Sequence, residues 1–156
     1  MHAFVNDLER TMGTYLYGRR MYETMMFWDN PPTETDEPPV FWDDARIWQA
    51  AEKVVYSRTL QAPVRGHSSS ESSIPPPCVS SRRPREHASQ IGGAELASQA
   101  IAAGLVDQCH LFLCPVVVGG GKHALSDNVR AELQLLDERR FRNGVVHLHY
   151  RLSRSY

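Results

Sequence analysis

Three short apolar segments, each ending in a glycine or hydroxyl-bearing turn, constrain the fold of this chain more than any other feature. They are TYLYG at 14–18, KVVYS at 53–57 and the IGG turn at 91–93. The first and the third lead directly into segments with a helical spacing of apolar residues, at 19–28 and 93–103. Strands that alternate with helices in this way predict an α/β fold around a mostly parallel sheet.

The C-terminal third of the chain predicts a different kind of strand pairing. Asn143-Gly144 lies between two apolar segments, and this dipeptide is the strongest short hairpin signal that a sequence offers. The hairpin adds an antiparallel end to the mostly parallel sheet. Before this hairpin, we expect Gly104 to end the helix that is predicted at 93–103. The remaining patterns predict helices at 2–10 and 42–53 and strands at 109–121, 133–141 and 145–153.

The composition fits a single globular domain over residues 1–156. With 17 basic and 18 acidic residues the net charge is −1, which gives no electrostatic footprint for nucleic acid or an anionic membrane. No apolar run approaches the length of a membrane span, and the start, MHAFVNDLER, lacks the apolar core of a signal peptide. The three cysteines form no CxxC pair, so we expect a cytoplasmic chain with free thiols.

The glycine pair at 92–93 predicts one part of a ligand site. Ligands of open α/β sheets bind outside the carboxyl ends of the strands. Gly92 and Gly93 allow a ligand to approach the backbone closely, and the N-terminus of the following helix then holds a pyrophosphate. The alternative is an ordinary tight turn between a strand and a helix.

The other two strand ends predict further contacts to a phosphate-bearing ligand. Ser57 and Thr59 offer hydroxyl groups and Arg58 a fork of donors, which suits a phosphate monoester such as the 2′-phosphate of NADPH. Gly18 followed by Arg19 adds a second cationic contact at a helix start. The alternative for Ser57–Thr59 is a surface turn.

The histidines and the acids give weaker indications of chemistry. His147 and His149 share one strand face, which allows a two-ligand metal site, but ordinary strand histidines fit the pattern better and we expect no metal. Glu23 is the acid nearest to the predicted ligand, and we expect it to face solvent or cap a neighbour. The catalytic residues are therefore left unassigned.

Four segments together resemble a known family. GRRMYE, VVYSRTL, the run from IGGAEL to CPVVVGGG, and FRNGVVHLHYR are similar to the dihydrofolate-reductase-like family that includes the C-terminal reductase domain of the bacterial riboflavin biosynthesis protein. The resemblance implies a three-layer αβα fold with a mixed, mostly parallel central sheet and a C-terminal β-hairpin. It also implies a homodimer.

The resemblance implies an NADPH-dependent oxidoreductase, similar to 5-amino-6-(5-phosphoribosylamino)uracil reductase or dihydrofolate reductase, that transfers hydride to a pterin- or pyrimidine-like small molecule. Two alternatives stay open, namely a nucleotide-binding remnant without activity and a fragment that folds only with a partner chain. Carried over from the family, the adenosine phosphates contact Gly18, Arg19, Ser57, Arg58 and Thr59, and the pyrophosphate contacts Gly92, Gly93, Ala94 and Glu95.

Two departures from the family pattern affect these expectations. The family begins with a strand that lines the nicotinamide and substrate pocket, and we expect this chain to start downstream of it. The second departure is the segment 64–90, where the Ser-rich run 68–73 argues against a buried strand and Pro75-Pro76-Pro77 against a helix. We expect this segment to be disordered or frameshifted. A frameshift pair in the gene, a genuine disordered insertion and a phosphorylated regulatory segment are its three explanations.

Overall fold

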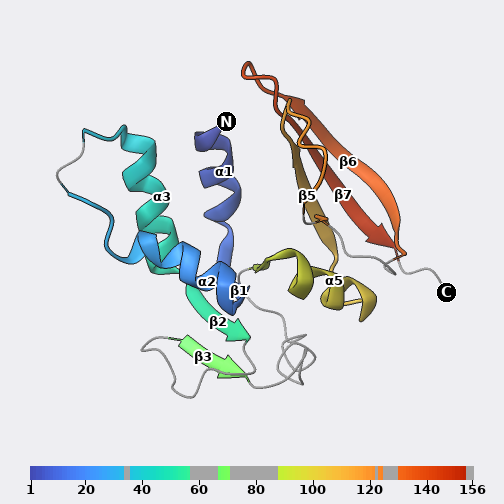
Figure 1. The fold of residues 1–156 in the computed structure, drawn as a ribbon, viewed down its shortest axis with the longest axis horizontal. Coiled ribbons are helices and arrows are strands. Elements are labelled where there is room, and N and C mark those ends of the chain that lie inside the picture. The colour runs from blue at the N-terminus through green and yellow to red at the C-terminus, as the bar shows by residue number, and fades with distance from the viewer. Residues whose placement is uncertain (34–35, 57–66, 71–87, 122, 125–129, 154–156) are drawn as a thin grey trace. The chain divides into compact units, whose positions relative to one another are not determined.

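The computed structural model describes residues 1–33, 36–56, 67–70, 88–121, 123–124 and 130–153 (Figure 1). These residues form two compact units, Met1–Leu96 and Ala97–Tyr156, called here the N-terminal unit and the C-terminal unit. The expectation of one domain over residues 1–156 stays a prediction.

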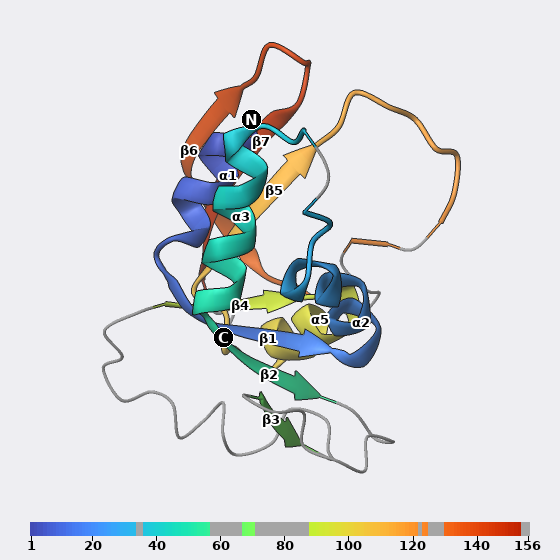
Figure 2. The ribbon, with the colours of Figure 1, turned by 90° about the vertical axis from the view of Figure 1, so that its left-hand side faces the viewer.

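The N-terminal unit is built around a four-stranded sheet in which every pairing is parallel (Figure 2). The strand order is β3-β2-β1-β4, and helices connect β1 to β2, as parallel pairing requires. In chain order the elements are α1 (His2–Glu9), β1 (Met12–Gly18), α2 (Arg19–Met25), the 3-10 helix η1 (Met26–Asp29), α3 (Pro39–Ala50), β2 (Glu52–Tyr56), β3 (His67–Ser70) and β4 (Ala88–Gly92).

Aromatic side chains fill the core of the N-terminal unit. Tyr15, Tyr17 and Trp48 are 0 %, 2 % and 0 % exposed. The two-residue period of β1 places Tyr15 and Tyr17 on one face, where their rings stack with centroids 5.6 Å apart. The Nζ atom of Lys53 on β2 lies 4.1 Å from the ring centroid of Trp48, a cation–π contact, and burial lowers the pKa of Lys53. The core is therefore formed mainly by aromatic side chains, and it includes the amine of Lys53 against the ring of Trp48.

A hydrogen-bond network joins α1 to α3, which lie side by side (Figures 1 and 2). Asn6 is 2 % exposed, and its Nδ2 donates to the carbonyl of Val40 at 2.9 Å and to Oδ2 of Asp43 at 3.0 Å. The same oxygen accepts a bond from Nη2 of Arg10 at 2.6 Å. Because Asn6 and Arg10 donate to its charged form, the pKa of Asp43 is lowered. This buried asparagine fixes how α1 meets α3.

The C-terminal unit holds a three-stranded antiparallel sheet of order β5-β7-β6. Helix α5 begins in the N-terminal unit and crosses the boundary between the two units. The elements are α5 (Ala94–Ala102), β5 (Gln108–Leu113), β6 (Glu132–Arg140) and β7 (Val146–Ser153).

Two glycines predicted from the sequence to form turns do so. Gly104 has φ of 63° and follows α5, where its N–H and that of Leu105 donate to the carbonyls of Ile101 and Ala100, both at 2.9 Å. Gly144 has φ of 85° in the turn between β6 and β7. A left-handed backbone favours glycine at both positions.

The predicted strand at 109–121 is wrong beyond Leu113, because β5 ends there. Pro115 follows, which has no N–H group for a strand ladder, and then come the glycines 119–121. Among residues 116–118 the side chains of Val116, Val117 and Val118 are 66 %, 96 % and 79 % exposed. The apolar composition of this segment therefore does not reflect a buried strand.

The expectation that 64–90 lacks secondary structure is wrong at two stretches. Strand β3 covers His67–Ser70, and β4 starts at Ala88, ahead of the IGG turn. In the described sheet β3 pairs only with β2, and an edge strand needs backbone partners more than apolar side chains. Residues 64–66 and 71–87 lie outside the described residues, so a frameshift or an insertion there stays a hypothesis.

Candidate functional site

The carboxyl ends of β1, β2 and β4 meet at one edge of the parallel sheet. Tyr17 is in register with Gly92 of β4, and Gly18 is in register with Tyr56 of β2. Helix α2 starts directly after Gly18, and α5 starts two residues after Gly92. The sheet thus brings together the strand ends that the sequence predicted to share a ligand. We call this place the strand-end edge.

Gly18 leaves open space at the strand-end edge. A Cβ atom added to Gly18 would meet nothing within 4 Å. Its backbone is extended, with φ of −70° and ψ of 154°, so the position does not need glycine for its conformation. Arg19 follows as the first residue of α2, half exposed, with its Nε donating to Oε1 of Glu23 at 2.7 Å. Glu23 therefore pairs with a neighbour, one of the two outcomes expected from the sequence.

Gly92 and Gly93 are required by the fold itself. A Cβ on Gly92 would lie 2.4 Å from Cε1 of the Tyr17 ring, closer than any real contact. Gly93 has φ of 100°, in the region that favours glycine. The predicted alternative, a tight strand-to-helix turn, thus explains Gly93, and the Tyr17 ring explains Gly92, whether or not a ligand binds there. Tyr17 is the residue that makes Gly92 necessary.

The start of α5 offers backbone rather than side-chain contacts to a ligand. Ala94 is the first residue of this helix, and Glu95 is an exposed acid in its first turn. The N–H groups of a helix N-terminus favour an anion, but a carboxylate there already interacts with the helix dipole. Glu95 would repel a pyrophosphate through its side chain, so a contact at this residue has to come from its main chain. Ser57, Arg58 and Thr59 lie outside the described residues.

A half-buried carboxyl group at the end of α1, that of Glu9, was not predicted from the sequence. Oη of Tyr15 donates to Oε2 of Glu9 at 3.1 Å. Burial raises the pKa of Glu9, and the carboxylate of Asp44 on α3 raises it further. Burial also raises the pKa of Asp44. Glu9 ends an amphipathic helix, where an acid normally faces water, so no sequence signal distinguishes it from a surface residue.

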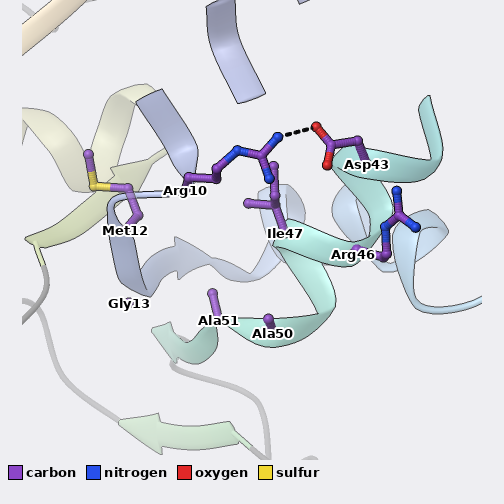
Figure 3. Close-up of a pocket in the computed structure, with 8 residues that line it drawn as sticks. All are labelled: Arg10, Met12, Gly13, Asp43, Arg46, Ile47, Ala50 and Ala51. Carbon is purple, nitrogen blue, oxygen red and sulfur yellow. Dashed lines mark hydrogen bonds and ion pairs between the residues drawn. The ribbon is translucent and has the colours of Figure 1, made fainter. Parts of the chain in front are cut away.

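An open pocket of about 520 Å³ lies at the other end of β1 (Figure 3). Its lining includes Met12 and Gly13, where β1 begins, and a stripe of α3 that carries Asp43 and Ile47. The ion pair between Arg10 and Asp43 crosses it. Because Met12 and Gly18 are at opposite ends of the strand, this pocket is separate from the strand-end edge.

Metal ligation finds no support in the described part of the chain. No group of three or more His, Cys, Asp or Glu side chains there could hold a metal ion. The ring centroids of His147 and His149 are 6.5 Å apart. None of the described helices is long and apolar enough to cross a membrane.

The strand order and the strand-end edge are those of an α/β protein with a parallel sheet, and comparison with known proteins shows what the chain is similar to. The family model of the RibD C-terminal domain matches residues 81–147. The uncharacterized protein YyaP of Bacillus subtilis is 27 % identical over 149 residues, which are 94 % of this chain and 76 % of that protein. The resemblance to the C-terminal reductase domain of the riboflavin biosynthesis protein is therefore confirmed.

Solved structures confirm the dihydrofolate-reductase-like α/β fold. A protein of Shewanella sp. PV-4 described as a riboflavin biosynthesis protein matches with a TM-score of 0.72 and 13 % identity, covering 97 % of this chain and 80 % of its own. The diaminohydroxyphosphoribosylaminopyrimidine deaminase/5-amino-6-(5-phosphoribosylamino)uracil reductase of Thermotoga maritima matches with a TM-score of 0.56 and 14 % identity, covering 97 % of this chain and 48 % of its own. The chain thus corresponds in fold to reductases of the riboflavin-pathway type.

Proposed function

We propose that this protein is an NADPH-dependent reductase that transfers hydride to a C=N or C=O bond of a pterin- or pyrimidine-like small molecule. The observation that carries the proposal is the meeting of three strand ends at one edge, with Gly18 beside Tyr56 and Tyr17 beside Gly92. The similarity in fold to the Thermotoga maritima protein, a 5-amino-6-(5-phosphoribosylamino)uracil reductase, supports the substrate class. The match to the RibD C-terminal domain supports the type of reaction.

The strand-end edge fits the phosphates of such a cofactor in two respects. The open space at Gly18 admits a ligand against the backbone, and the half-exposed Arg19 stands next to it. The N-terminus of α5 supplies main-chain N–H groups near Gly93 and Ala94. In this proposal Gly18, Arg19, Ser57, Arg58 and Thr59 hold the adenosine phosphates, and Gly92, Gly93, Ala94 and Glu95 lie at the pyrophosphate.

The residues of the chain bind and orient, while NADPH supplies the hydride. Because Gly92 has no side chain, the Tyr17 ring packs directly against its backbone, and the ends of β1 and β4 lie close together. Arg19 contributes a fixed positive charge that discriminates the extra phosphate of NADPH from the hydroxyl of NADH. Without cofactor, Glu23 accepts a hydrogen bond from Nε of Arg19, so its carboxylate competes with a phosphate for the same guanidinium.

A thermal melt with saturating cofactor tests the proposal. NADPH at about 100 times its Kd stabilises a protein by about 2.7 kcal/mol, or roughly 5–10 °C for a domain of this size. We expect NADPH to raise Tm by this amount and NADH to raise it less. No shift with millimolar NADPH would overturn the proposal.

Two variants separate a specific site from general binding of an anion. Arg19→Gln should weaken NADPH binding about tenfold, while Arg20→Gln, a neighbouring exposed arginine, should leave it unchanged. Gly18→Ala should fold normally, because the space beside Gly18 is open, and should bind NADPH less tightly. Equal effects of Arg19→Gln and Arg20→Gln would show that only net charge matters.

We also propose a homodimer and a cytoplasmic location for this reductase. The resemblance to the family implies the dimer, and the exposed leucines of β6, Leu133, Leu135 and Leu136, at 44 %, 48 % and 36 % exposure, support it. The free thiols of Cys109 and Cys114 are consistent with the cytoplasm. Sedimentation analysis of the wild type and of Leu135→Glu checks the dimer, because a charge at this face should shift the protein toward monomer.

A further inference from the structure

Three histidines form a row across the β5–β7 pair, and we call them the histidine ladder. His110 on β5 is directly opposite His149 on β7, and Phe112 is directly opposite His147. Side chains opposite one another in an antiparallel pair share a face of the sheet, so all three imidazoles lie on one face. His147 is 1 % exposed, and its ring lies 4.7 Å from that of Phe112.

The contacts within the histidine ladder are close and specific. Nδ1 of His110 and Nε2 of His147 are 2.9 Å apart, a hydrogen-bond distance. The rings of His110 and His149 stack with centroids 4.1 Å apart and an interplanar angle of 16°. Nε2 of His149 lies 2.9 Å from Oε1 of Gln108, and since that oxygen can only accept, the proton is on His149. The ladder therefore continues from Gln108 through all three rings.

The distance between His110 and His147 limits how many protons this pair can hold. Two ring nitrogens at 2.9 Å form a hydrogen bond only when one of them carries a proton and the other accepts it. If both imidazoles become imidazolium ions, both facing nitrogens carry protons and the two charges repel. The contact between β5 and β7 at this point must then open.

The groups around the histidine ladder come from all three strands of the sheet. From β6, Asp137 faces His149 and Arg139 faces His147, while Arg151 on β7 is opposite Gln108. Asp137 favours a positive charge on His147, whereas Arg139 and His149 oppose it, and burial opposes it most. Burial, followed by His149 and His147, lowers the pKa of His110 to about 4. The surroundings of His110 and His147 thus favour the neutral form of both rings.

We propose that the histidine ladder is a pH-sensitive contact between β5 and β7, which holds while its imidazoles are neutral and opens when acid protonates both members of the His110–His147 pair. Nothing in this proposal depends on the cofactor or on the reaction. It assigns a pH response to His147, which the sequence predicted to be an ordinary strand histidine, and to His110, which no sequence pattern indicated.

The direction of the pH effect follows from the lowered pKa of His110. Its value of about 4 in the folded state lies below the ordinary value of about 6.5 in the unfolded state, so the unfolded chain takes up a proton first as the pH falls. The stabilising effect of the neutral ring is complete above about pH 6.5 and is lost progressively toward pH 4. Between pH 7.5 and pH 5, His110 alone lowers the ratio of folded to unfolded protein by up to about 30-fold.

Denaturant unfolding at pH 7.5 and pH 5 tests the proposal on the full chain. We expect a clearly smaller acid-induced loss in His110→Gln, since glutamine can accept or donate the same hydrogen bond but does not titrate. His2→Gln, which changes an exposed histidine of α1, should keep the loss of the wild type. An equal loss in the wild type and in His110→Gln would overturn the proposal.

Nitrogen NMR of the imidazole rings gives a second measurement that does not depend on any variant. As long as the protein is folded, we expect His110 and His147 to remain neutral even below pH 6. We also expect complementary tautomers, in which one of the two facing nitrogens donates a proton and the other accepts it. Two independent titrations at the ordinary value of about 6.5 would mean that the pair shares no proton, and the proposal would be wrong.

Discussion

The two units bury different kinds of side chain. In the N-terminal unit the largest buried side chains are Trp48, Tyr15 and Tyr17. In the described part of the C-terminal unit the largest fully buried side chain is that of His147, and all nine residues of β6 are exposed. The first unit therefore owes its stability mainly to apolar surface, whereas the second depends on backbone pairing and on a polar row of rings.

This difference implies different responses to the same perturbation. Removing apolar volume should affect the N-terminal unit strongly and β6 weakly, because only buried methylene and ring atoms leave a cavity. Lowering the pH from 7.5 to 5 should act most on the histidine ladder of the C-terminal unit, because imidazole groups titrate in this range and burial lowers the pKa of His110 and of His147. The variants below test each half of this comparison.

Trp48→Ala should have the largest effect. The side chain is 0 % exposed and packs in one cluster with Tyr15, Tyr17 and Val55, so its loss leaves a large cavity under α3. We expect a loss of about 3–5 kcal/mol in the free energy of unfolding, measured by urea denaturation. Against a typical stability of about 5–15 kcal/mol, this variant is close to unfolding.

Leu135→Ala on β6 is the matched control for Trp48→Ala, measured at a concentration at which the protein is monomeric. Leu135 is 48 % exposed in the single chain, so truncation should cost the monomer less than about 1 kcal/mol. Equal losses in the two variants would show that the C-terminal sheet has an apolar contact as important as the aromatic core. The comparison between the units would then fail.

Gly92→Ala should have the next largest effect, about 1–3 kcal/mol. The added Cβ would lie 2.4 Å from the Tyr17 ring, which is itself 2 % exposed and has no room to move. Gly18→Ala, at the end of the same β1, should change stability by less than about 1 kcal/mol, since the space beside it is open. Thermal melts of the two variants measure the difference. Similar melts would mean that Tyr17 moves aside easily.

The pattern of strands and helices could be predicted from the sequence because local signals and tertiary packing agree. Tyr15 and Tyr17 lie two residues apart in an apolar segment that forms β1, and Asn143-Gly144 forms the turn that its composition indicates. The prediction failed at 114–121 and at His67–Ser70. At 114–121 the apolar composition predicts a strand, but Pro115 and the three glycines do not continue one. At His67–Ser70 the polar composition argues against a strand, but an edge strand of serines pairs through its backbone.

Asn6→Ala should cost about 1–3 kcal/mol. Asn6 is 2 % exposed and donates to Val40 and to Asp43, so its removal leaves a buried carbonyl with one partner fewer. The variant should also raise the pKa of Asp43 toward its ordinary value, because the hydrogen bond from Asn6 is the largest cause of the lowered pKa. A carboxyl group with a lowered pKa in the folded state stabilises the protein at pH values above its ordinary pKa, and this stabilisation is lost as the pH falls. Because Asn6→Ala removes part of this contribution, the stability of the variant should fall less in acid than that of the wild type.

Asp7→Asn is the control for Asn6→Ala. Its side chain is 75 % exposed, at 3.7 Å from Arg10, and surface pairs of this kind contribute little. We expect no measurable change in unfolding between pH 7 and pH 4 from this variant. If Asp7→Asn lost as much stability as Asn6→Ala, the contact between α1 and α3 would depend on surface charge and not on the buried amide of Asn6.

Of the candidate site, the sequence predicted the convergence of strand ends and missed the reason for its glycines. The register of β1 with β2 and β4 follows from parallel pairing, which the strand–helix alternation indicates. The contact between Gly92 and the Tyr17 ring links residues 75 positions apart in the chain, and no local pattern reports it. The bond between Glu9 and Tyr15 is hidden for the same reason, because burial of Glu9 depends on how α1 lies on the sheet.

Glu23→Gln should have the smallest effect on stability, at most about 0.5 kcal/mol, because Arg19 and Glu23 are 48 % and 50 % exposed. Its value lies in cofactor binding, measured by fluorescence titration with NADPH and NADH. If Arg19 meets the extra phosphate of NADPH, the Glu23 carboxylate competes for the same guanidinium, and its removal should raise NADPH affinity by up to about threefold without changing that for NADH. A stability loss above about 1 kcal/mol would instead make the pair part of the fold. The stability of the N-terminal unit would then depend on the surface ion pair of Arg19 and Glu23 as well as on the buried side chain of Trp48.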